Sequence, residues 1–127
     1  MATVGWYYAN SGMRRLSESN RTSGDIQSNM CRPHSVKEKG VGNELGIVGM
    51  SGNVLEWCND WADKIYYSAS PMEDPQGPAS GEYRVLRGGC WVLCARGCRS
   101  ASRCGFSPDF RTFCVGFRLC CSAGQRE

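Results

Sequence analysis

Abundant glycine and short apolar runs favour turns and short strands in this chain over long helices. The chain has 16 Gly in 127 residues, and Gly42, Gly46, Gly49 and Gly52 follow one another closely. Glycine adopts positive φ without steric cost, so this spacing is typical of tight turns. Short apolar runs between turns indicate short strands, and the length leaves room for one domain. We therefore expect a single loop-rich domain over residues 1–127.

Short apolar runs and turn residues locate the expected elements. The polar segment 9–42 predicts loops with a short helix. Leu55, Trp57 and Trp61 share one parity, which favours a strand after the glycine turns, although a helix starting near Asn53 is the alternative. Three further strands are predicted at residues 83–89, 99–103 and 115–120. The proposed core residues are Leu45, Ile47, Met50, Val54, Leu55, Trp57, Trp61 and Trp91.

Positive charge is concentrated near the C-terminus. The net charge is only +3, but seven Arg and a single acid, Asp109, lie between Arg84 and Arg118. Such a stripe is able to bind nucleic acid or another anion. Alternatively, these arginines pair with acids such as Glu56 and Asp60 across the fold. We favour this second interpretation, because a basic patch by itself shows only a positive electrostatic field. No stretch has the ~20 apolar residues of a membrane span.

The nine cysteines allow several readings. Seven lie between Cys90 and Cys121, but none has C-x2-C spacing and the one histidine is His34, which disfavours zinc. A disulfide scaffold would need an oxidising compartment, and residues 1–10 lack the features of a signal peptide. Reactive thiols near arginine are a third possibility. The fourth is that these cysteines occupy positions that tolerate many residues.

Five motifs resemble those of formylglycine-generating-enzyme-like (sulfatase-modifying factor) domains. They are NELGIVGMSGNVLEWCNDW at 43–61, RVLRGG at 84–89, CRSASR at 98–103, SPDFR at 107–111 and VGFRL at 115–119. Their order and spacing also match. The resemblance implies an α+β, C-type-lectin-like fold of the formylglycine-generating-enzyme type, with short strands and much irregular loop.

That superfamily has two very different uses. One is a copper-dependent oxidase that converts a sulfatase cysteine into formylglycine. The other is the variable protein of diversity-generating retroelements, in which errors at template adenines rewrite surface positions. Cys94 and Cys98 lie where the oxidase has its reactive cysteines, but the spacing differs and the loop is shorter. We therefore assign no catalytic residue, no metal and no cofactor.

Substitutions within residues 90–114 favour the variable-protein reading. Similar domains with an undiversified segment are rich in Asn there, and an AAC codon randomised at both adenines becomes NNC. That set contains Cys, Phe, Leu, Val, Ser, Thr and Gly, and a mutated AGC serine codon gives Cys90. Between these positions, framework residues such as Arg87, Trp91 and Arg103 are the same as in the undiversified domains. The predicted ligand-binding positions are Cys90, Val92, Leu93, Cys94, Gly97, Ser102, Cys104, Gly105, Phe106, Phe110, Thr112, Phe113 and Cys114.

The resemblance thus predicts recognition rather than turnover. Phe106, Phe110 and Phe113 are the expected anchors, because aromatic rings supply contact area at low entropic cost. We expect a monomer that binds a protein or other macromolecule, not nucleic acid. The alternatives are an oxidase acting on a peptide cysteine and a basic nucleic-acid-binding module. Asn53 and Glu56 are expected to bond loop backbone rather than a ligand.

Overall fold

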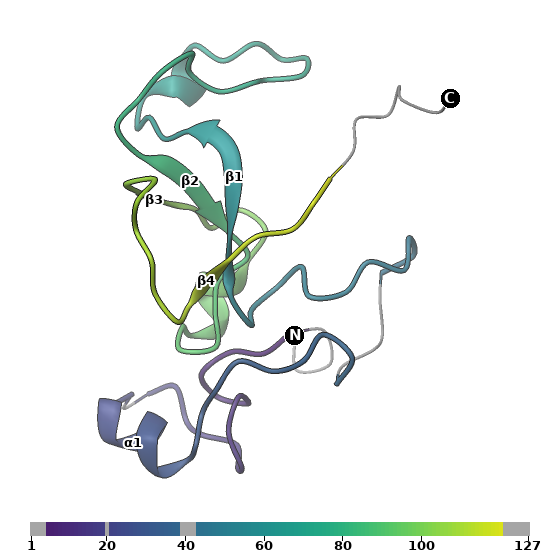
Figure 1. The fold of residues 1–127 in the computed structure, drawn as a ribbon, viewed down its shortest axis with the longest axis vertical. Helices are drawn as coiled ribbons and strands as arrows, with labels where there is room; N and C mark the ends of the chain where they lie inside the picture. The colour runs from purple at the N-terminus through teal and green to yellow at the C-terminus, as the bar shows by residue number, and fades with distance from the viewer. Residues whose placement is uncertain (1–4, 20, 39–42, 121–127) are drawn as a thin grey trace.

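The computed structural model describes residues 5–19, 21–38 and 43–120 and consists of a small sheet with long irregular connections (Figure 1). The sheet lies in the middle of the molecule, and the N-terminal segments with helix α1 lie below it in this view. No helix among the described residues is long and apolar enough to span a membrane. The few helices, the mixed sheet and the abundant loop form the expected C-type-lectin-like fold.

A single turn-and-a-half of α-helix, α1 (Ser23–Ser28), interrupts the polar N-terminal region. Thr22 caps it, since its hydroxyl accepts a hydrogen bond from the Asp25 backbone N–H at 3.0 Å. Capping satisfies a donor that the first turn leaves without a partner. The prediction of one short helix in this region is confirmed.

Four strands form one sheet in the order β3-β2-β1-β4. The central pair is β1 (Leu55–Trp61) and β2 (Arg84–Arg87), which run antiparallel with Trp57 opposite Leu86. β3 (Cys104–Phe106) adds antiparallel to β2, and β4 (Val115–Gly116) adds parallel to β1. The strands expected after the glycine turns and near residues 83–89 are both confirmed.

The strand expected at residues 99–103 is wrong. The chain forms a 3-10 helix, η2 (Ala95–Cys98), and then a turn in which Ser102 N–H donates to the Arg99 carbonyl at 2.9 Å. Two side chains stabilise this turn, because Arg99 Nε and Ser102 Oγ both donate to the Arg96 carbonyl at 3.1 Å. The strand expected at residues 115–120 is shorter than predicted and covers only β4.

Cysteines form much of the core. Four of them are buried, and the two hydrophobic clusters bring them together with aromatic and small residues. A free cysteine behaves as a small hydrophobic residue, which suits a core of this size. The buried hydrophobic residues are Tyr7, Tyr8, Ala9, Cys31, Val85, Leu86, Cys90, Trp91, Cys98 and Cys114.

The core prediction was partly wrong for residues of the glycine-rich segment. Leu45, Ile47 and Met50 are 77%, 40% and 53% exposed, because the turns direct this segment away from the sheet. Trp91 is buried as predicted. Trp61, expected in the core, is only half-buried, and the guanidinium of Arg84 covers its ring at 3.6 Å. Trp57 is half-buried as well.

Glu56 pairs with an arginine, as expected for the basic stripe, and the prediction that its side chain bonds loop backbone is wrong. Its carboxylate accepts from Arg118 Nε and a second guanidinium nitrogen, both at 2.6 Å, and Arg118 also donates to the Val48 carbonyl. This bidentate pair raises the pKa of Arg118. The similar pairing expected for Asp60 is absent among the described residues. Other arginines bind carbonyls and rings instead, as Arg87 does with the Ser100 carbonyl.

Candidate ligand-binding surface

Asn53 is the point at which three parts of the chain meet. Its backbone has a positive φ of 68°, which Asn tolerates better than most residues. Its N–H donates to the Trp6 carbonyl at 2.7 Å, and its carbonyl accepts from Trp91 N–H at 2.9 Å. The side chain bonds both the N–H and the carbonyl of His34, at 2.8 and 3.0 Å. Asn53 therefore bonds loop backbone, as predicted.

The N-terminal segment holds the first part of the predicted variable segment by its backbone. Three carbonyls and one N–H between residues 91 and 95 have partners between residues 8 and 21. These contacts are Tyr8 N to Leu93 O (2.9 Å), Ser11 Oγ to Trp91 O (3.0 Å), Arg21 to Val92 O (3.0 Å) and Ala95 N to Glu18 Oε1 (3.0 Å). None of them uses the side chain of Val92, Leu93 or Cys94. A change of side chain at these positions leaves these bonds in place.

Some predicted positions line one hollow. Leu93, Gly97, Ser102 and Cys104 contribute to a pocket of about 430 Å³ between η2 and the sheet. All of them are half-buried, so each presents part of its surface to solvent. Three separate stretches of the predicted variable segment thus converge on one depression.

The phenylalanines lie on the loop around β3 and after it. Phe106 and Phe110 stack on each other, with ring centroids 4.2 Å apart and planes 14° from parallel. Phe113 is 70% exposed and tilts against Trp91 with the centroids 5.6 Å apart. Thr112, next to it, is half-buried. The described contacts bring the first two phenylalanines together, but not the third.

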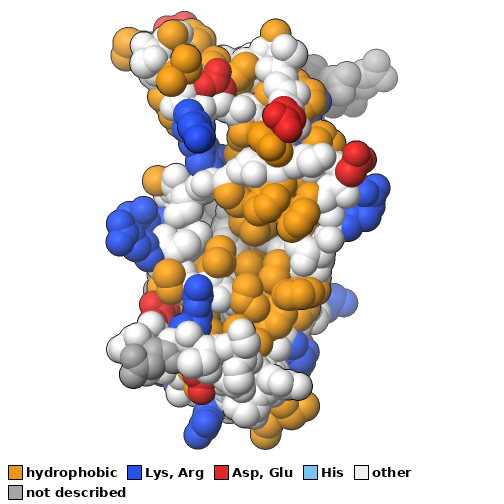
Figure 2. All heavy atoms as spheres, turned by 90° about the vertical axis from the view of Figure 1, so that its left-hand side faces the viewer, with side chains coloured by type: hydrophobic (Ala, Val, Ile, Leu, Met, Phe, Trp, Pro, Cys, Tyr) orange, Lys and Arg blue, Asp and Glu red, His pale blue; other side chains and the backbone are white. Residues whose placement is uncertain are grey.

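Figure 2 looks onto the side of the molecule where β3 and the following loop lie in Figure 1. Hydrophobic side chains gather in the middle of this face, with lysine and arginine toward its edges. A large exposed apolar patch with a polar rim marks an interaction site in soluble proteins. The face therefore has the composition of a protein-binding surface.

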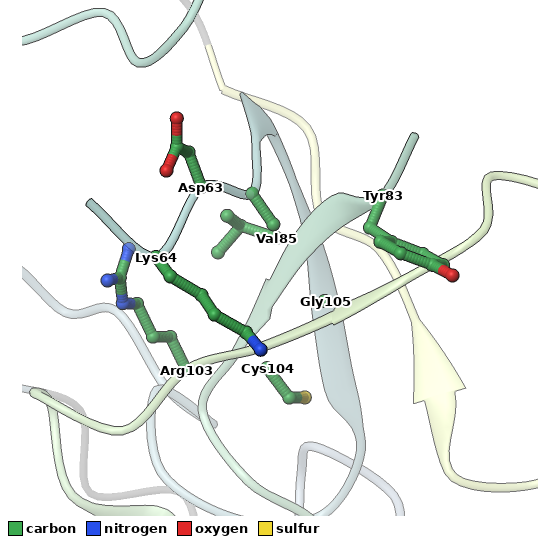
Figure 3. A pocket seen from close by; sticks show the side chains of 8 residues that line it. Asp63, Lys64, Tyr83, Val85, Arg103, Cys104 and Gly105 are labelled. Carbon is green, nitrogen blue, oxygen red and sulfur yellow. The ribbon is translucent and has the colours of Figure 1, made fainter. Parts of the chain in front are cut away.

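A second pocket, of about 400 Å³, combines predicted variable positions with framework residues that sequence reasoning missed. Val85 lies at its centre, with Lys64 and Arg103 on one side and Tyr83 on the other (Figure 3). Cys104 and Gly105 also line it. Asp63 lines it too, so its apolar surface lies beside two cations and one carboxylate. No motif around Lys64 or Tyr83 signals a pocket.

The two glycines among the predicted positions are more restricted than the others. A Cβ at Gly105 would lie 2.8 Å from the Ala62 Cβ, although Gly105 itself is exposed. A Cβ at Gly97 would lie 3.2 Å from the Leu93 Cβ. Larger residues at these positions require Ala62 or Leu93 to shift.

Two predicted contact positions face inward. Cys90 is 2% exposed and Cys114 is 7% exposed, and both pack in one cluster with Cys31 and Trp91. Their side chains are therefore unable to contact a ligand on the surface. The codon argument that selected these positions carries no information about side-chain direction, which explains the error.

One of the two cysteines that lie where the oxidase has its reactive pair is deeply buried. Cys98 is 1% exposed, and its Sγ points at the Cys90 carbonyl at 3.9 Å. Burial raises the pKa of Cys98 to about 11, so it is a neutral thiol at pH 7. Among the described residues, no three His, Cys, Asp or Glu side chains are arranged to hold a metal ion.

The model of the sulfatase-modifying factor enzyme 1-like domain matches residues 1–123. The chain belongs to this family. A solved relative, Treponema denticola variable protein 1, superposes with a TM-score of 0.68 over 91% of this chain and 34% of its own, at 36% identity. This neighbour confirms the resemblance to variable proteins.

Two further proteins that resemble part of this chain are an enzyme and a protein kinase by name. The formylglycine-generating enzyme of Streptomyces coelicolor is 43% identical over 79 residues, which are 60% of this chain and 25% of that protein. Serine/threonine-protein kinase pkn1 of Chlamydia pneumoniae is 47% identical over 78 residues, 60% of this chain and 13% of that protein. The chain thus spans about a quarter or less of these two relatives.

Proposed function

We propose that this chain is a ligand-binding protein whose face around residues 92–113 is diversified by a retroelement. The observation that carries the proposal is that the backbone of this segment and its side chains have different surroundings. Framework residues hold its backbone, as the bond from Tyr8 N–H to the Leu93 carbonyl illustrates. The side chains at most of the predicted positions remain at least partly open to solvent. Such a segment accepts many sequences without losing its shape.

The relatives support this function over the alternatives. The similarity to Treponema denticola variable protein 1 extends over nearly the whole chain. Similarity to the Streptomyces coelicolor formylglycine-generating enzyme favours an oxidase instead, but the cysteine spacing of the oxidase is not reproduced and Cys98 is buried. We infer that the ligand is a protein or another macromolecule, and that the chain acts as a monomer.

The chemistry of the surface indicates how it binds. The stacked Phe106 and Phe110 and the exposed Phe113 provide rigid apolar area. The pocket beside Lys64 and Arg103 accepts a side chain that inserts from the ligand. Binding through buried apolar anchors depends little on ionic strength, whereas nucleic-acid binding weakens steeply with salt.

Two matched libraries on a display surface test the proposal. The first carries NNC codons at positions 92, 93, 94, 102, 106, 110, 112 and 113. The second carries the same codons at framework positions 91, 95, 96, 99, 103, 109, 111 and 115. We expect the first library to remain protease-resistant and to yield binders to lysozyme and to streptavidin, used as probe proteins. Loss of resistance in the first library, or no binders from it, overturns the proposal.

The oxidase alternative has its own test. The wild type and a Cys94→Ser/Cys98→Ser variant are titrated with Cu(I) and incubated with a cysteine-containing sulfatase peptide. We expect the same copper affinity for both proteins and no formylglycine in the peptide. Formylglycine that forms with the wild type and not with the variant would favour the oxidase.

A further inference from the structure

The two inward-facing cysteines lie at the two ends of the predicted variable segment. The backbone beside each is tied to the same short stretch of framework. Trp91 N–H, next to Cys90, donates to the Asn53 carbonyl at 2.9 Å, and the Cys114 carbonyl accepts from Leu55 N–H at 2.7 Å. Asn53 and Leu55 are two residues apart, so they are separated by at most about 7 Å. The framework thereby brings the ends of the segment together.

The side chains of Cys90 and Cys114 also meet. Both belong to the buried cluster with Cys31 and Trp91. Each thiol shifts the pKa of the other, and neither cysteine is part of a disulfide here. A disulfide spans Cα atoms only about 4.4–6.8 Å apart, so it requires two cysteines whose side chains pack in one cluster, as these do.

We propose that Cys90 and Cys114 form a disulfide on oxidation, which closes the predicted variable segment into a covalent loop. The segment would then be fixed at both ends while its exposed side chains stay unchanged. This proposal goes beyond ligand binding and does not depend on it. If the cross-link forms but no ligand binds, the disulfide proposal holds and the proposed function fails. If a ligand binds but no cross-link forms, only the disulfide proposal fails.

A peroxide is an oxidant small enough for so enclosed a site. The Cys90 thiolate attacks one peroxide oxygen, the O–O bond breaks, and Cys90 becomes a sulfenic acid as hydroxide leaves. The Cys114 sulfur then attacks the Cys90 sulfur and loses its proton, and the sulfenic oxygen leaves as water. Two thiols lose two electrons in total, and one hydrogen peroxide is reduced to two waters.

Local contacts assign the role of nucleophile to Cys90. The hydrogen bond from Cys114 and the N–H groups of Val92 and Leu93 lower the pKa of Cys90 to about 7, with a smaller contribution from Arg21. The same interaction raises the pKa of Cys114. Burial raises the pKa of Cys98 and of Cys104, and the nearby Cys90 raises each of them further. At neutral pH, Cys90 is therefore the thiolate of this group.

Peptide mapping tests the cross-link directly. The full chain is treated with limiting hydrogen peroxide, its free thiols are alkylated, and it is digested with trypsin. We expect the peptide 88–96 to be joined to the peptide 112–118. Peptide 88–96 also contains Cys94, so a Cys94→Ser variant, which should keep the cross-link, makes the assignment unambiguous. Cys90→Ser should abolish it.

Two further measurements complete the test. Thiolate absorbance near 240 nm should show a titration centred near pH 7, because the Cys90 thiolate is present above its pKa, and Cys90→Ser should remove it while Cys58→Ser retains it. The oxidised chain should melt on the order of 10 °C higher than the reduced one. Cross-links that join Cys31 to either cysteine, or peroxide treatment that leaves Cys90 and Cys114 unpaired, would overturn the proposal.

Discussion

The turn at residues 51–56 and the segment at residues 90–114 use their side chains in opposite ways. In the turn, Asn53 and Glu56 bond the rest of the framework through their side chains. In the segment, the framework bonds backbone atoms, and side chains such as Phe113 extend into solvent. The segment thus combines buried residues such as Trp91 and Cys98 with exposed side chains that make no bond to the framework in the described contacts. This contrast makes definite predictions about which substitutions the chain tolerates.

The largest effect is expected for Gly52→Ala in the turn. Gly52 has a φ of 77°, and a Cβ there would lie 2.1 Å from the Trp6 carbonyl oxygen. Backbone strain and steric overlap together should lower the free energy of unfolding by about 3 kcal/mol or more. Urea denaturation measures the loss.

Gly46→Ala is the matched control for Gly52. Gly46 has a similar φ of 72°, but no atom lies within 4 Å of its would-be Cβ. Gly46→Ala should lower the free energy of unfolding by only about 1 kcal/mol, from backbone strain alone. Equal costs for the two variants would show that the close approach of Trp6 is unimportant.

Asn53→Ala should come next, with a loss of about 2 kcal/mol. The substitution removes both hydrogen bonds of the Asn53 side chain. The backbone N–H and carbonyl of His34 then lack these partners. Asn43→Ala removes two similar bonds, to Leu45 N–H and Ile47 N–H, but in an exposed loop. Thermal unfolding should show a far smaller change for Asn43→Ala, and comparable changes would contradict a special role for Asn53.

Glu56→Gln should have a moderate effect that depends on salt. The Arg118 and Glu56 side chains are 35% and 21% exposed, so solvent screens their attraction. We expect a loss of about 1 kcal/mol at low ionic strength and less at high ionic strength. Glu38→Gln, in a pair whose carboxylate is 41% exposed, is the control and should change little. A loss independent of salt would point to packing rather than charge.

The smallest effect is expected in the segment itself. Phe113→Ser should change the free energy of unfolding by less than about 0.5 kcal/mol, because the ring is mostly exposed. The apolar control is Leu86→Ala, whose side chain is 0% exposed and whose loss should cost about 2–5 kcal/mol. A cost above 2 kcal/mol for Phe113→Ser would place its ring in the core and break the comparison.

Local pattern predicted the central strands well. The alternation of Leu55, Trp57 and Trp61 identified β1, and the run before Gly88 identified β2. The turn after η2 was missed because Arg99 and Ser102 satisfy the Arg96 carbonyl through side chains, which a strand pattern does not reveal. Long-range contacts decide that geometry.

The candidate surface was predictable in part, for a physical reason. The resemblance located the segment, but not the direction of each side chain, so Cys90 and Cys114 were misplaced. The N-terminal partners Tyr8 and Ser11 were also missed. They bond Leu93 and Trp91, which are far away in the sequence, so no local pattern reveals the contact. The available signals were two short stretches, Gly5-Trp6-Tyr7 and Asn10-Ser11. Trp6 of the first meets Asn53, and Ser11 of the second bonds the Trp91 carbonyl.

The most direct test of the central claim is the DNA sequence around the gene. The account predicts a near-copy of the codons for residues 90–114 beside a reverse transcriptase gene. The copy should differ from the gene only where the copy has adenine, and the differences should fall on the predicted variable positions. A flanking sequence without such a copy, or a copy that differs at other bases and at framework positions such as Arg87 and Arg103, would contradict the account.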